Sequence, residues 1–308
     1  MNTQSSAVSG SFGSQGIAPA ALSVTRPMYW SVRRELWENR SIYLAPLVAA
    51  AVFLSGFLIS LIGLPRKMRG LSALDPAKQH AAIEMPYDTV AALIMGIAII
   101  VGVFYCLDAL YGERRDRSIL FWKSLPVSDL TTVLSKLAIP LVILPLFSFA
   151  ITVATQFIML LLSSVVLLGS GLGVGTLWTQ SSFFHVSLGL LSHLLIIHGL
   201  WYAPFYGWLL VVSAGAPRAP FIWAFLPPFV ICAVEKMAFN TSHFAGILLY
   251  RATGPETYTP VPGSTMMDLM PALPPMHFFS TPGLWNGLAL AVGFLAAAVW
   301  LRRYRGPI

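Results

Sequence analysis

Apolar runs that carry few or no charged side chains divide this chain into segments long enough to cross a lipid bilayer. The first run, residues 42–64, has 23 residues and no charge. Because an α-helix rises 1.5 Å per residue, a hydrocarbon core of about 30 Å requires about 20 residues. The sequence therefore predicts an all-α integral membrane fold with six transmembrane helices. The five later runs are residues 89–111, 137–168, 183–214, 220–236 and 285–301.

The composition supports a membrane protein and excludes several other classes. Only 10% of the residues are charged and 56% are hydrophobic, whereas an average soluble domain has about 25% charged residues. The basic residues form no long basic face, so we expect no nucleic-acid partner. The chain has no P-loop, HExxH or GxSxG motif, and both cysteines fall in apolar runs. We therefore expect no catalytic residue and no metal site.

Lysine and arginine are unequally divided between the loops that this layout places on opposite sides of the membrane. Four segments on one side hold 13 of them, and the segments on the other side hold six. Cytoplasmic loops of membrane proteins are enriched in these residues. Both termini are therefore predicted to be cytoplasmic. The basic-rich segments are residues 26–41, 112–136, 214–220 and 302–308.

Two further features precede the first apolar run. Residues 1–25 are uncharged and rich in Ser, Gly and Ala, which predicts a disordered tail before a single six-helix membrane domain at residues 26–308. Between residues 26 and 42, aromatic and basic residues recur at helical spacing and suit the lipid headgroup layer. We expect an interfacial elbow helix there, the alternative being a basic flank of the first span. Its candidate residues are Trp30, Arg33, Arg34 and Trp37.

Residues 110–137, between the second and third predicted spans, concentrate charge. They hold eight of the 31 charged side chains, whereas their middle, residues 118–125, is apolar and aromatic. Pro126 interrupts the segment, and Ser128 or Asp129 can cap the next helix. We expect a short amphipathic helix on the cytosolic membrane face, suited to binding a soluble partner.

The order of motifs in this segment is Glu113-Arg114, a Ser-led apolar turn at residues 118–120, Pro126-Val127-Ser128, and Lys136 in the next helix. In this order the segment resembles the cytosolic loop that precedes the third helix of ABC-2-type transporter permeases. The resemblance implies that the short helix is a coupling helix, which passes the movement of an ATPase into the membrane. Phe121 and Trp122 would be its apolar anchors in a groove of that ATPase. The alternative for Trp122 is an interfacial lipid anchor.

The resemblance also implies a function and partners. The chain would be the transmembrane subunit of an ABC exporter for an amphiphilic or hydrophobic substrate, in a bacterial inner membrane. ATP and Mg²⁺ would bind two copies of a separate ATPase subunit, and a second permease chain, identical or homologous, would complete the assembly. The predicted ATPase-coupling residues are Glu113, Arg114, Arg115, Arg117, Ser118, Leu120, Phe121, Trp122 and Lys123.

Polar residues inside the apolar runs leave alternatives open. The spacing of three polar residues places them on one helix face: Thr152, Thr155 and Gln156. They either line a substrate pathway or form hydrogen bonds between helices. An intramembrane enzyme would use histidines of the fourth run with Glu235. These histidines, His185, His193 and His198, do not share one helix face, which argues against a metal site. A membrane sensor or scaffold subunit that relays the state of an ATPase without transport is the third alternative.

The remaining segments are assigned to the extracytoplasmic side. Residues 240–251 are too short to cross a bilayer, so we expect a short interfacial or re-entrant helix between the fifth and sixth spans. Residues 64–88 and 169–180 are predicted as polar and glycine-rich loops. Residues 254–282 hold seven prolines and are predicted as a further loop.

Overall fold

The computed structural model describes residues 25–71, 75–125, 127–175, 178, 187, 190, 191, 194–254 and 275–308. All regular secondary structure in these residues is helical. The predicted tail, residues 1–25, lies outside them apart from Thr25. The all-helical class is confirmed, and five helical segments are long and apolar enough to cross a membrane, which indicates a multi-pass membrane protein. Among the described residues they are Ser41–Gly70, Ala81–Arg115, Asp129–Gly169, Pro220–Phe239 and Pro282–Tyr304, and the six-span topology stays a prediction.

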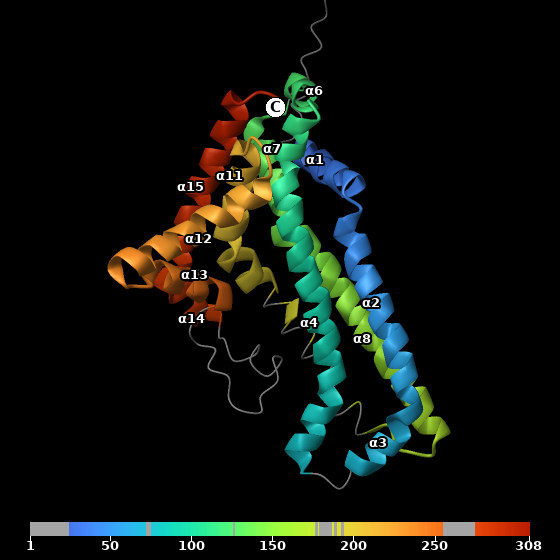
Figure 1. The fold of residues 1–308 in the computed structure, drawn as a ribbon. Helices are drawn as coiled ribbons and strands as arrows, with labels where there is room; N and C mark the ends of the chain where they lie inside the picture. Colours follow the sequence, from blue (N-terminus) through green and yellow to red (C-terminus); the bar gives the residue numbers. More distant parts are fainter. Residues whose placement is uncertain are drawn as a thin grey trace, which may run out of the picture.

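The first two long helices form an antiparallel pair (Figure 1). Helix α1 (Thr25–Glu38) lies across one end of the molecule, and α2 (Ser41–Ser60) runs from there to the opposite end. A 3-10 turn (Leu61–Gly63) and α3 (Leu64–Leu71) follow, and α4 (Pro76–Ala109) returns along α2.

The predicted loop at residues 64–88 is therefore mostly helical. Pro76 occupies the first turn of α4, where its missing N–H costs no hydrogen bond. The 34 residues of α4 extend for about 51 Å, well beyond a hydrocarbon core of about 30 Å. The charged residues of this segment mark the end of the apolar stretch and not the end of the helix.

The segment that was expected to hold a coupling helix contains two short helices, α5 (Tyr111–Arg115) and α6 (Ile119–Ser124). Helix α7 (Asp129–Ala138) follows, and Ser128 caps it by accepting a hydrogen bond from the Thr131 amide at 3.0 Å. A π-helical turn (Ile139–Ile143) joins α7 to α8 (Leu144–Gly169). Pro140 and Pro145 lack the N–H groups that a regular helix would use here, which explains the local change of hydrogen-bond pattern.

The second half of the chain packs against the upper part of α4 and α7 in Figure 1. The fourth predicted span lies partly outside the described residues; its described part includes a π-helical segment (Leu194–Trp201) and α11 (Ala203–Gly215). Helices α12 (Pro220–Phe239) and α13 (His243–Thr253) follow. Residues 255–274 of the predicted proline-rich loop lie outside the described residues. Helix α14 (Pro275–Ser280) then leads into α15 (Pro282–Tyr304).

The largest buried apolar cluster lies where α4, α7, α11 and α15 meet. Cys106, Val133, Leu210 and Ala298 are fully buried in it. Gly207 allows α11 to approach α15 closely, because an added Cβ would lie only 3.2 Å from the Phe294 Cβ. This packing places the ends of α1, α7, α11 and α15 together, at the same end as α6 (Figure 1).

Candidate functional site

Six charged side chains converge beneath α6, and we call them the buried charge cluster. They come from helices that are far apart in the sequence but meet at one end of the molecule (Figure 1). Most of the side chains are buried, so their charges depend on one another rather than on water. The members of the buried charge cluster are Arg34, Glu35, Glu113, Asp129, Lys136 and Arg302.

The deepest contact of the cluster joins α1 to α7. The ammonium of Lys136 lies 2.8 Å from Glu35 Oε1, and each side chain is 3% exposed or less. The other carboxylate oxygen of Glu35 accepts a hydrogen bond from the Tyr105 hydroxyl of α4 at 2.8 Å. Glu35 therefore fixes three helices relative to one another.

Glu113 of α5 is the centre of the cluster. Its Oε1 lies 3.1 Å from both Lys136 Nζ and Arg34 Nη2, and its Oε2 accepts a hydrogen bond from Arg302 of α15. Arg302 also donates through Nε to Asp129 at the start of α7, at 3.0 Å. Three acidic and three basic side chains balance, so every buried charge in the cluster has an opposite partner.

Arg34 connects the cluster to α6. Its guanidinium carbon lies 3.4 Å from the centroid of the Trp122 ring, a close cation–π contact. Desolvation lowers the pKa of Arg34, but the hydrogen bond to Glu38 and the charges of Glu35 and Glu113 outweigh it and raise the pKa above its usual value. Arg34 therefore stays charged, and Trp122 is held against α1 instead of pointing freely outward.

Helix α6 has one attached face and one free face. Ile119 is buried, and Lys123 Nζ donates to the Arg303 carbonyl at 3.2 Å. Leu120 and Phe121 are each 60% exposed. Ser118 Oγ donates to the Glu113 carbonyl at 3.4 Å, at the turn that leads into α6. Of the two predicted anchors, Phe121 is presented outward, whereas Trp122 packs within the chain.

Two of the predicted ATPase-coupling charges are not available to a partner in this structure. Glu113 lies in the buried charge cluster, and Arg114 is buried as well. Arg114 Nη1 donates to the carbonyls of Ala214 and Ala216 at 2.8 and 3.1 Å, and its Nε donates to the Gly306 carbonyl at 3.2 Å. Both residues hold neighbouring segments of the chain together, and their part in coupling to an ATPase stays a prediction.

The other predicted charges of this segment are exposed. Arg115 pairs with Asp116 at 2.9 Å and with Asp108 at 3.6 Å, near the end of the second span. Arg117 is exposed and has a left-handed backbone with φ of 58°. Arg115 and Arg117 are therefore accessible to a partner, although the charge of Arg115 is balanced by its two acidic neighbours.

The elbow residues lie on α1 as their spacing suggested. Trp30 and Trp37 are exposed, and the Arg33 guanidinium carbon lies 5.2 and 5.4 Å from the centroids of their rings. Arg34 differs from these residues because it turns inward, into the buried charge cluster. The position of α1 in the headgroup layer stays a prediction.

The candidate pathway residues lie apart from the cluster and are buried between helices. Gln156 Nε2 donates to the Tyr87 carbonyl of α4 at 3.1 Å, and Thr155 Oγ1 donates to the Ile151 carbonyl of its own helix at 2.6 Å. Thr152 is fully buried, and its hydroxyl has no hydrogen-bond partner in the described structure. The contact of Gln156 matches the interhelical alternative.

The residues of the enzyme alternative do not form a described site. His185 and His193 lie outside the described residues. His198 is buried, and its Nε2 lies 3.2 Å from the Pro140 carbonyl and 3.4 Å from the Tyr206 hydroxyl. Glu235 accepts hydrogen bonds from the amides at the start of α13. In the part of the chain that the structure describes, no three metal-ligating side chains come together.

The sequence did not predict that Glu35 contacts Lys136 and Tyr105 at the buried charge cluster. Glu35 and Lys136 lie in segments that were interpreted separately, and Tyr105 lies in a membrane span. One signal was present, because isolated charges beside or within apolar runs are costly unless they pair. The sequence does not indicate which of them pair.

Comparison of the chain with protein-family models, with curated proteins and with solved structures found no match.

Proposed function

We propose that this chain is the transmembrane subunit of an ABC-2-type transporter in a bacterial inner membrane. A separate ATPase subunit, present in two copies, would bind ATP and Mg²⁺, and a second permease chain would complete the transporter. The observation that carries the proposal is the placement of α6. Its exposed Leu120 and Phe121 form a free apolar face directly above a buried charge cluster that joins four helices.

The contacts provide a physical route from a docked partner into the membrane helices. A partner that binds Leu120 and Phe121 would move α6 and, through Trp122, the guanidinium of Arg34. Arg34 and Glu113 would pass this movement to α7 and α15, which together contribute Lys136 and Arg302. Close-packed, hydrogen-bonded groups favour a few discrete arrangements over continuous deformation.

The energy for such a switch must come from a difference in affinity. The partner must bind the two arrangements of the helices unequally, because a ligand with equal affinity for both shifts nothing. A coupling of about 3 kcal/mol would change the ratio of the two states roughly 150-fold. An amphiphilic or hydrophobic cargo suits the apolar spans, with export as the direction that the resemblance implies.

The test compares an exposed residue on the free face of α6 with an exposed residue on another helix. Phe121→Ala should reduce co-purification of the ATPase and transport together, because it removes an exposed apolar anchor. Phe229→Ala is the matched control, since Phe229 is equally bulky and exposed but lies on α12. Retained association and full transport with Phe121→Ala would contradict the proposal. Association without transport in the wild-type chain would favour the sensor or scaffold function.

A further inference from the structure

A second cationic site lies away from the buried charge cluster, where α13 meets α15. Arg251 is in the last turn of α13 and is partly buried. Its guanidinium carbon lies 4.3 Å from the centroid of the buried Trp201 ring, and its Nη2 donates to the Gly283 carbonyl at 2.8 Å. Any side chain at Gly287 would overlap the guanidinium, so the glycine provides the space for it.

The charge of Arg251 has no acidic partner in the described structure. The ion pairs among the described residues do not include it. Among the described residues, its guanidinium donates to two backbone carbonyls, of Gly283 and, at 3.5 Å, of Trp201. A guanidinium has five N–H donors, more than the two carbonyls among the described residues use. A planar guanidinium fixed on an aromatic ring suits two-pronged binding of a phosphate.

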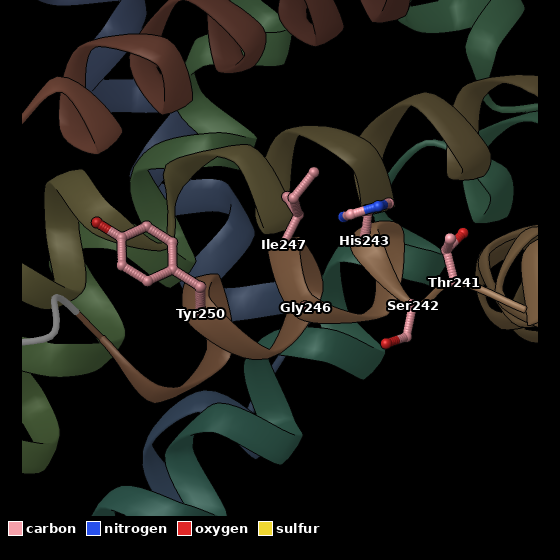
Figure 2. A pocket seen from close by; sticks show the side chains of 6 residues that line it. All are labelled: Thr241, Ser242, His243, Gly246, Ile247 and Tyr250. Carbon is pink, nitrogen blue, oxygen red and sulfur yellow. The ribbon is translucent and has the colours of Figure 1, made fainter.

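An open depression of about 550 Å³ runs along α13 (Figure 2), and Tyr250, the residue before Arg251, is part of its lining. Thr241, Ser242 and His243 line its polar end, and Gly246, Ile247 and Tyr250 line the rest. A Cβ at Gly246 would meet no other atom, so the depression is open there. The Tyr250 ring contacts Trp201 edge-on, with centroids 5.3 Å apart, which joins the depression to the Arg251 site.

Helix α13 itself suits the surface of a membrane. It has 11 residues, none of them buried, and exposes Ile247 and Leu249. At 1.5 Å per residue it is about 16 Å long and cannot cross a bilayer. Ile247 and Arg251 are four residues apart, so an apolar contact and the cation lie on the same face of α13.

We propose that Arg251 and the depression along α13 bind a phosphate-bearing ligand, namely an anionic phospholipid. The phosphate would accept hydrogen bonds from N–H groups of Arg251 that have no partner among the described residues, and an acyl chain would lie along Gly246 and Ile247. A soluble phosphate ester offers the same headgroup chemistry without the chain. The site does not depend on the ATPase partner of the proposed function, so the two proposals can fail separately.

The experiment is native mass spectrometry of the detergent-purified full chain during titration with lipid. We expect phosphatidylglycerol to bind at least about tenfold more tightly than phosphatidylcholine, whose headgroup carries a cation. Arg251→Gln should weaken phosphatidylglycerol binding by about tenfold or more, since hydrogen bonds to charged groups are of that strength. Lys236→Gln is the matched control, because it removes the same charge from an exposed position near the end of α12.

Two further variants keep the test decisive. Gly246→Phe fills the depression at an exposed helical position and should weaken phosphatidylglycerol binding without changing the binding of inorganic phosphate. Equal binding of inorganic phosphate and lipid, unaffected by this variant, would retain the phosphate site and assign it to soluble phosphate esters. If Arg251→Gln does not fold, Arg251→Lys takes its place. It keeps the charge at the C-terminus of α13 but loses the planar group, so it should also weaken phosphatidylglycerol binding. Wild-type affinity in both Arg251 variants, or equal losses in Lys236→Gln, would overturn the proposal.

Discussion

Lys136 Nζ lies 2.8 Å from Glu35 Oε1, in an ion pair that joins side chains 101 positions apart in the sequence. The pair fastens α1 to α7, which is the first part of the long apolar helical segment Asp129–Gly169. Both side chains are excluded from water, and each also contacts another polar group, Tyr105 or Glu113. Such a pair is specific in geometry and costly to disrupt on one side only.

Removing the cation of this pair should destabilise the fold strongly. Lys136→Met leaves Glu35 without a cation at hydrogen-bond distance and takes one of the cations from Glu113, which should cost about 3–5 kcal/mol in free energy of unfolding. Denaturation in mixed detergent micelles measures this. The double variant Glu35→Gln with Lys136→Met should regain part of the loss. Lys67→Met, at an exposed position on α3, is the control and should change stability by less than about 0.5 kcal/mol. Equal losses in the two single lysine variants would contradict the pairing.

The Tyr105 hydroxyl should contribute measurably through Glu35. Tyr105→Phe removes only the oxygen that donates to the buried carboxylate. A hydrogen bond to a charged group contributes about 1.5–3 kcal/mol, so unfolding should become easier by that amount. Tyr304→Phe removes the same atom from an exposed side chain and should be neutral. The interpretation fails if Tyr105→Phe is as stable as the wild-type chain.

Arg34 should restrain α6 through Trp122. Arg34→Lys keeps the charge but removes the planar group that lies on the indole. A loss of about 1 kcal/mol would accelerate amide hydrogen exchange in α6 roughly fivefold, which mass spectrometry can follow by segment. Arg33→Lys is the control, because it makes the same substitution beside Trp30 and Trp37, away from α6. It should leave the rate of amide hydrogen exchange in α6 unchanged. An unaltered rate of amide hydrogen exchange in α6 after Arg34→Lys would show that Arg34 does not restrain α6.

The backbone just before α12 is strained at Ala219, and a substitution should relieve this strain. Ala219 precedes α12 with φ of 45° and ψ of 66°, a left-handed conformation that costs a residue with a Cβ about 1–2 kcal/mol. Ala219→Gly should therefore stabilise the protein by about 1 kcal/mol in chemical denaturation. Ala216→Gly is the control, because Ala216 has φ of −64° and gains nothing from glycine. A destabilised Ala219→Gly protein would show that this backbone conformation is not adopted.

The sequence predicted the helical membrane class because apolar length is a local property. The five candidate spans follow from apolar runs with few charges, and the short apolar turn at residues 118–125 coincides with α6. Ser128 could be predicted as a helix cap because its hydroxyl accepts a hydrogen bond from an amide only three positions away. Residues 64–88 were misinterpreted as a loop because polarity reports the edge of the membrane and not the end of a helix.

The candidate site was harder to predict because its contacts are remote in sequence. Glu113 belongs to the motif of the resemblance, but whether it faces a partner or the chain depends on where Arg34 and Arg302 lie. Trp122 and Phe121 are neighbours of similar character, yet one packs on Arg34 and the other is exposed. Adjacent residues on a short helix point in different directions, and only the packing of α1 decides which one is covered.

The most direct measurement is photo-crosslinking in native membranes with benzoylphenylalanine in place of Phe121. The account predicts a crosslinked product that contains an ATP-binding protein, identified by mass spectrometry, because Phe121 is an exposed aromatic residue beside Trp122, which contacts the buried charge cluster. The same probe at Phe229 of α12 should not capture that protein. Crosslinks from position 121 that contain no nucleotide-binding protein, or that reach only lipid and other copies of this chain, would contradict the account.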